Sequence, residues 1–132
     1  MAGKPRAARK SGAGRYRAAQ SESTEQTIFV NRVRQLYSDV VIFAIPNGGG
    51  RSKKEGAKLK AEGVLAGVPD LMVPKANVVY NGLFIEMKKV GSRGMSKHQK
   101  LISAKLVAEG YLVATCFGHE EAWNTFEEYM KL

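Results

Sequence analysis

Two segments of this chain set its architecture: Gly-Val-Pro-Asp-Leu-Met-Val at residues 67–73 and Phe-Ile-Glu-Met-Lys at residues 84–88. Side chains alternate across a β-strand, so Glu86 and Lys88 project from one face of the second segment while Met87 points away. If the two apolar runs pair as strands, the carboxylate of Asp70 lies beside that of Glu86. Two adjacent carboxylates can share a hard divalent cation, and we therefore predict a metal site here.

The same residues also have an ordinary structural interpretation. Pro-Asp is a common turn or strand-entry pair, and Glu-x-Lys on a strand often forms a solvated ionic face. The flanking runs 71–73 and 83–85 are apolar enough to be interior strands, however, and a carboxylate at the end of an interior strand needs a partner. The position of these residues therefore favours the metal site.

The composition predicts one basic domain with a separate tail. A chain of 132 residues fits a single domain, and its formal net charge is +9. Residues 1–20 hold six basic and no acidic residues, which leaves 9 − 6 = +3 for residues 21–132. We expect residues 1–20 to be a disordered basic tail that is attracted to nucleic acid or merely aids solubility. Residues 21–132 are then the folded domain.

Several classes of protein are disfavoured by the same sequence. The tail lacks the apolar segment of a signal peptide, and no later run approaches membrane-spanning length. We expect a soluble protein without a membrane partner, in the cytoplasm of a bacterium or of a phage-infected cell. Cys116 is the only cysteine, which excludes an internal disulfide and a cysteine-based zinc site.

The order of helix and strand patterns predicts an α/β fold with a small mixed central sheet flanked by helices. Helical patterns cover about residues 24–38, 52–62, 96–109 and 119–130, and Ser23/Gln26 and Ser96/Gln99 fit capping boxes. Strand patterns cover residues 40–45, 71–73, 83–87 and 111–116, and we expect the first to be buried. Residues 78–80 either form a separate strand or extend the one that follows.

Two polar side chains in the predicted helices each have two interpretations. Glu25 falls on an apolar stripe, where its carboxylate either complements the helix dipole or reaches the predicted cleft as a third acidic group. Gln99 fits a capping box, yet it shares a stripe with Ile102 and Leu106 that faces the sheet. We expect Gln99 to serve the cap and the cleft at different moments. His98 reads as a surface residue.

Candidate nucleic-acid contacts begin with the segment Asn47, Gly48, Gly49, Gly50 and Arg51. It is either a flexible turn or a contact to the DNA backbone, because adjacent glycines can turn N–H groups toward an anion and arginine can grip a phosphate. It matches neither the dinucleotide fingerprint nor a P-loop. The further candidates for DNA contact are Lys53, Lys54, Arg93 and Lys97.

Together these motifs resemble the VRR-Nuc family (virus-type replication-repair nucleases) of the PD-(D/E)xK restriction-endonuclease-like superfamily. The resemblance extends from Ser23 to the C-terminus and rests on Glu25 and on residues 46–51, 67–70, 84–88 and 96–99. It implies a metal-dependent endonuclease with Mg²⁺ or Mn²⁺. For stand-alone members it also implies a homodimer that cuts branched DNA, such as the four-way (Holliday) junctions of DNA repair. The catalytic residues that it implies are Glu25, Asp70, Glu86, Lys88 and Gln99.

The resemblance also suggests a role for each group. Asp70, Glu86 and the backbone carbonyl of Met87 would bind the cation, and Glu25 would bind an outer-sphere water or a second ion. Lys88 would position the attacking water or take up its proton, and Gln99 would orient either Lys88 or that water. One alternative is a catalytically silent DNA-binding module that uses the basic tail and the glycine segment. The other is a protein directed to RNA, which the absence of RNP-like aromatic motifs disfavours.

Overall fold

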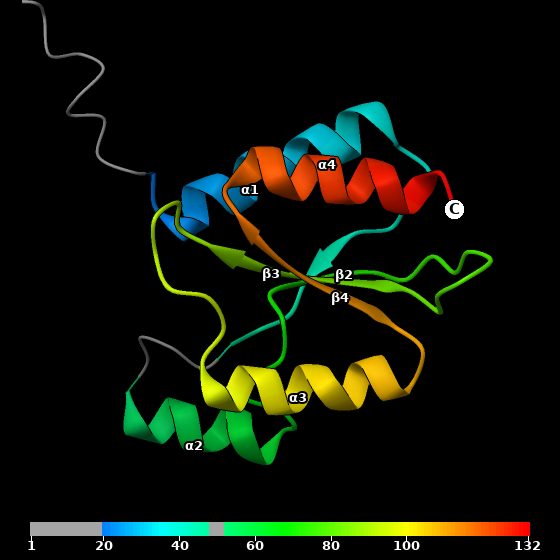
Figure 1. Ribbon diagram of the computed structural model, residues 1–132. Helices are drawn as coiled ribbons and strands as arrows, with labels where there is room; N and C mark the ends of the chain where they lie inside the picture. The colour runs from blue at the N-terminus through cyan, green and yellow to red at the C-terminus, as the bar shows by residue number, and fades with distance from the viewer. Residues whose placement is uncertain (1–19, 48–51) are drawn as a thin grey trace, which may run out of the picture.

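The structure contains the predicted mixed sheet, with helices on both of its faces (Figure 1). The computed structural model describes residues 20–47 and 52–132. The predictions for the tail before residue 20 and for Gly48, Gly49, Gly50 and Arg51 therefore lie outside the described residues. The elements follow in the order α1 (Glu22–Leu36), β1 (Phe43–Ala44), α2 (Lys53–Ala61), β2 (Leu71–Val73), β3 (Leu83–Lys88), α3 (Lys97–Ala108), β4 (Leu112–Phe117) and α4 (His119–Met130).

Two helical layers enclose the sheet. Helices α1 and α4 cover one face, and α3 covers the other with α2 beside it (Figure 1). The strand order is β1-β2-β3-β4, with antiparallel pairing from β1 to β3 and parallel pairing between β3 and β4. This arrangement confirms the predicted fold class. Across residues 20–47 and 52–132, no helix has both the length and the apolar character needed to cross a bilayer.

The register of the sheet places the two predicted carboxylates side by side. Leu71 pairs with Ile85, so the next antiparallel pair brings Asp70 opposite Glu86. On the other side, Ile45 N donates to the carbonyl oxygen of Asp70 at 2.8 Å. Strand β3 has a neighbour on each side, and its first five residues are buried. Glu86 is therefore held in the interior, as the apolar run around it predicts.

An aromatic core fixes α1 against α4. The rings of Phe29 and Phe126 meet edge to face with centroids 6.2 Å apart, and Tyr37 packs on Phe126 in the same geometry at 5.0 Å. Trp123 is 5% exposed and lies in this cluster, as expected for a core residue. The packing holds α1 and α4 side by side over one face of the sheet.

The first predicted strand is much shorter than its apolar run. Only Phe43–Ala44 pair with β2, and both are exposed, so the prediction of a buried strand over residues 40–45 is wrong. Strand β1 lies at the edge of the sheet and its partner β2 has only three residues. Ile42 is the member of the run that enters the core. An apolar run at an edge has too little partner surface to be buried.

Residues 78–80 form a turn, so both predictions of a strand there are wrong. The side-chain oxygen of Asn77 accepts from Val79 N at 2.9 Å and from Tyr80 N at 2.8 Å. These local bonds occupy the backbone groups that a strand would offer to a neighbour. Val78 is 88% exposed at the tip of the turn. A β-branched pair alone does not make a strand when an Asx turn competes for its amides.

One of the two predicted capping boxes is present. Ser96 caps α3, and the reciprocal bonds with Gln99 are both made. The N-cap of α1 is Ser21, whose hydroxyl accepts from Thr24 N at 3.1 Å, so the box predicted at Ser23 and Gln26 is wrong. A second contact, between the hydroxyls of Ser21 and Thr24 at 2.9 Å, adds to this earlier start.

Candidate active site

Asp70 and Glu86 lie side by side where the start of β2 meets β3, as the spacing predicts. Asp70 precedes β2, and its Oδ2 accepts from the backbone N–H of Met87 at 2.7 Å. This bond ties the carboxylate to the strand that carries Glu86. The side chain of Met87 faces the core, whereas its backbone N–H donates to Asp70. Since Met87 directly follows Glu86, its backbone lies beside both acidic residues. The two strands thus hold two carboxylates and one peptide group at one point.

Glu86, Lys88 and Gln99 form a closed ring of polar contacts. Lys88 Nζ lies 3.6 Å from Glu86 Oε1 and donates to Gln99 Oε1 at 3.1 Å. Gln99 Nε2 completes the ring by donating to the same Glu86 Oε1 at 3.0 Å. Glu86 and Lys88 share a face of β3, as the strand period requires. The ring leaves the second oxygen of Glu86 outside these contacts.

Gln99 serves the helix cap and the ring at the same time. The side-chain Oε1 of Gln99 accepts from Ser96 N at 2.9 Å as well as from Lys88 Nζ. The backbone N–H of Gln99 donates to Ser96 Oγ at 3.2 Å. An amide oxygen has two lone pairs, and the amide nitrogen keeps two hydrogens for other partners. The prediction that the two roles exclude each other in time is therefore wrong.

Burial and neighbouring negative charges raise the pKa of both carboxyl groups. Burial, followed by the charge of Asp70, raises the pKa of Glu86 to about 7, while Lys88 acts in the opposite direction. Burial also raises the pKa of Asp70; the Met87 N–H opposes this, and the charge of Glu22 adds to it. Two buried carboxyl groups that lie close together resist being ionised at the same time. A cation bound between them would offset both the burial and the negative charge, and would lower the two pKa values.

One atom of this cluster lacks a hydrogen-bond partner. Glu86 Oε2 is buried and has no hydrogen-bond partner, and no other side-chain nitrogen or oxygen in the described part of the chain is both buried and unpaired. A buried acceptor without a partner is costly, so such an oxygen points to a ligand. With the carboxylate of Asp70 and the carbonyl of Met87 it offers the all-oxygen donors that Mg²⁺ and Mn²⁺ accept. The residues present therefore fit a magnesium-like ion.

The protein supplies few charged ligands for such an ion. Residues 20–47 and 52–132 contain no cluster of three or more His, Cys, Asp or Glu side chains arranged to hold a metal. A site with two carboxylates would be completed by a backbone carbonyl and water, which is the usual pattern for Mg²⁺. The metal ion stays a prediction.

Glu25 contacts the start of α4, and its predicted part in the active site stays a prediction. It is 6% exposed, and its Oε2 accepts from the backbone N–H of His119 at 2.7 Å, at the start of α4. Among the hydrogen bonds of the described residues, none joins Glu25 to Asp70 or Glu86. The acidic group of α1 whose charge reaches Asp70 is Glu22, which sequence reasoning missed. Its spacing of three from Glu25 places both on one side of the helix.

A solved structure described as a "VRR_NUC domain protein" matches this chain with a TM-score of 0.73 and 31% sequence identity, over 86% of this chain and 90% of that one. The chain belongs to the VRR-Nuc family. Membership of this family implies a nuclease-like function. No protein-family model and no curated protein matches the chain.

The predicted DNA contacts of this VRR-Nuc protein are accessible where they are described. Asn47, Lys53, Lys54, Arg93 and Lys97 are all exposed. Lys53 and Lys54 begin α2, and Lys97 begins α3 two residues before Gln99. Arg93 lies in the loop between β3 and α3. Exposure makes them available to a phosphate backbone, and their part in DNA binding stays a prediction.

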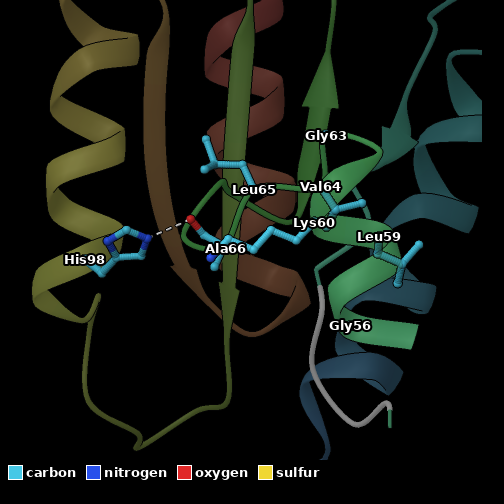
Figure 2. A pocket seen from close by; sticks show the side chains of 8 residues that line it. All are labelled: Gly56, Leu59, Lys60, Gly63, Val64, Leu65, Ala66 and His98. Atoms are coloured by element: carbon cyan, nitrogen blue, oxygen red, sulfur yellow. Dashed lines mark hydrogen bonds between the residues drawn. The ribbon is translucent and has the colours of Figure 1, made fainter. Parts of the chain in front are cut away.

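A cavity of about 610 Å³ lies between α2 and the first turn of α3 (Figure 2). Mostly apolar groups line it, together with Lys60 and His98, and neither Asp70 nor Glu86 is among them. The two carboxylates of the candidate active site therefore lie outside the lining of this cavity. His98 is exposed, as expected for a surface residue, and its Nε2 lies 2.9 Å from the carbonyl oxygen of Ala66, which accepts its hydrogen.

Proposed function

We propose that this protein is a divalent-metal-dependent DNA endonuclease that hydrolyses phosphodiester bonds. The observation that carries the proposal is the buried, unpaired Oε2 of Glu86 beside Asp70 and Lys88. A cation bound to this oxygen would supply its missing partner, and a lysine next to it can face a phosphate. The family implies a nuclease-like function, and these residues are the ones that would carry out such a reaction.

Each group of the cluster has a distinct part in the proposed reaction. Asp70, Glu86 and the carbonyl of Met87 would hold Mg²⁺ or Mn²⁺, which when bound supplies charge for the scissile phosphate and lowers the pKa of water. Lys88 positions the attacking water and stabilises the negative charge that develops on the phosphoryl oxygens. Gln99 orients Lys88 through the bond of 3.1 Å to Nζ.

Charged groups around the site support nucleic-acid binding. Lys53 and Lys54 are exposed at the start of α2, Lys97 is exposed at the start of α3, and Arg93 is exposed on the loop between β3 and α3. We expect them to contact phosphates and the basic tail of residues 1–20 to add sequence-independent attraction. Binding then weakens steeply as salt rises, because each phosphate contact releases counterions.

We further propose branched DNA, such as a four-way junction, as the substrate and a homodimer as the active species. One chain supplies one cluster of Asp70, Glu86 and Lys88. Two cuts across a symmetric junction need two such clusters related by symmetry. A monomer with the same cluster would produce single nicks. The mass of the protein in solution, measured together with its cut positions, distinguishes these cases.

The cleavage test uses three substrates: supercoiled plasmid, a synthetic four-way junction and an RNA of matched sequence. Each is incubated with Mg²⁺, with Mn²⁺ and with chelator. We expect cutting of DNA with either ion and none with chelator, and we expect Asp70→Asn and Lys88→Ala to bind DNA without cutting it. Lys105→Ala, an exposed lysine in the last turn of α3, serves as the matched control. Cutting by either site variant at the parent rate would refute the assignment.

A further inference from the structure

Helix α4 begins without a cap of its own. Its N-cap is Gly118, which has no side chain to accept from the first amides of the helix. The first N–H groups of any helix need acceptors from outside the helical ladder. A negative group is especially stabilising there, because the helix dipole is positive at this end.

Glu25 supplies the missing cap from another helix. Its Oε2 accepts from His119 N at 2.7 Å and lies 3.8 Å from Nε2 of the same histidine. The two residues are 94 positions apart in the chain. The carboxylate is almost fully buried, so this contact fixes α1 to α4 at a point where water has little access.

A further hydrogen bond connects this contact between α1 and α4 to Lys88. Gly118 N donates to the carbonyl oxygen of Lys88 at 3.0 Å, and Lys88 pairs with Phe117 across β3 and β4. Gly118 has a φ of 91°, and a Cβ there would lie 2.8 Å from Val90 Cγ2 and 3.5 Å from Glu25 Oε2. Two hydrogen bonds therefore connect the carboxylate of Glu25 to the backbone of Lys88 through a tightly packed turn.

We propose that Glu25 is a positioning residue that holds Lys88 in place through the start of α4, and that it does not bind the metal ion. The orphaned oxygen of the site belongs to Glu86, whereas the carboxylate of Glu25 already has the His119 amide as its partner. The charge on α1 that reaches Asp70 is that of Glu22. The catalytic part of this inference rests on the proposed nuclease function.

Glu25→Gln and Glu25→Ala separate positioning from metal binding. Glutamine keeps an acceptor for the His119 amide but loses the charge that a metal or its bound water would need, whereas alanine loses both. We expect Glu25→Ala to lower the melting temperature of the metal-free protein by about 4–8 °C, the usual effect of a lost cap. Hydrogen exchange at the His119 and Gly118 amides should rise about fivefold or more. Glu25→Gln should restore most of this protection.

Metal binding and turnover provide the decisive comparison. We expect calorimetry with Mn²⁺ to give Glu25→Gln an affinity within about twofold of the parent, while Asp70→Asn loses most binding. We expect kcat to fall about tenfold or more in Glu25→Ala and to recover in Glu25→Gln. Ser21→Ala is the matched control, since it removes the cap of α1 itself and leaves the contact to α4 intact. It should lose stability without losing kcat.

Two results would overturn the proposal. One is a loss of Mn²⁺ affinity in Glu25→Gln as large as that in Asp70→Asn. The other is unchanged exchange of the His119 and Gly118 amides in Glu25→Ala. Both are measured without DNA, so a parent protein that fails to cut DNA would contradict the proposed function while the cap and the metal role of Glu25 would still be decided.

Discussion

Replacing Glu86 by glutamine should stabilise the metal-free protein at alkaline pH. The pKa of Glu86 is raised from 4.5 to about 7, so the folded protein binds its proton more tightly than the unfolded chain does. This contribution to stability is complete below pH 4.5 and is lost as the pH rises through 7. The difference between the two pKa values corresponds to about 3 kcal/mol in the free energy of unfolding, at about 1.36 kcal/mol for each pH unit. Glutamine removes the titration and keeps an acceptor for Gln99.

The assay is thermal and urea unfolding in chelator at pH 5 and pH 8. We expect the parent to lose roughly 10 °C in melting temperature between these values, beyond the change seen in Glu86→Gln, since about 1 kcal/mol shifts a domain of this size by about 4 °C. Glu128→Gln changes the same charge at an exposed position of α4 and should leave the parent's pH dependence unaltered. Equal pH slopes for the parent and Glu86→Gln would refute the reasoning.

Three further predictions follow from neighbouring contacts. Gln99→Ala leaves Glu86 Oε1 with Lys88 alone and should cost about 1.5–3 kcal/mol in urea unfolding, with a larger loss of cleavage than of DNA binding. Gly67→Ala should lower the melting temperature, because its φ is 89° and a Cβ would lie 2.7 Å from His98 Cδ2; a variant as stable as the parent would contradict this packing. Mn²⁺ at about 100 times its dissociation constant should stabilise the parent at pH 8 by about 2.7 kcal/mol, and this gain should be much smaller in Glu86→Gln by thermal unfolding.

The part of the site that follows from local periodicity was predictable. The alternation of side chains along a strand put Glu86 and Lys88 on one face, and the antiparallel neighbour then brought Asp70 beside them. These inferences need only the strand period and the apolar character of two short runs. The capping box at Ser96 was predictable for the same reason, because its partners lie within one helical turn.

The contacts that sequence reasoning missed are set by tertiary packing. The partner of Glu25 is an amide 94 residues away, and nothing around Glu25 in the sequence identifies it. The hydrogen bond from His98 to Ala66 joins residues 32 positions apart. It depends on Gly67, because a side chain at that position would meet the imidazole ring. The edge position of β1 likewise depends on how many residues β2 can offer, which the apolar run at 40–45 does not reveal.

Gln99 shows how local and tertiary chemistry combine at this site. A capping box is satisfied by either Glu or Gln, because both offer an oxygen to the N-cap amide. Here Ser96 N and Lys88 Nζ both donate to Oε1, so the amide group cannot be turned over without placing its hydrogens against two donors. The other end of the side chain must then be the donor, and it faces the carboxylate of Glu86. The cap thus fixes the polarity of a group in the proposed active site. Glutamate would satisfy the cap but would add a third carboxylate beside two that already repel each other, and this physical conflict selects glutamine at position 99.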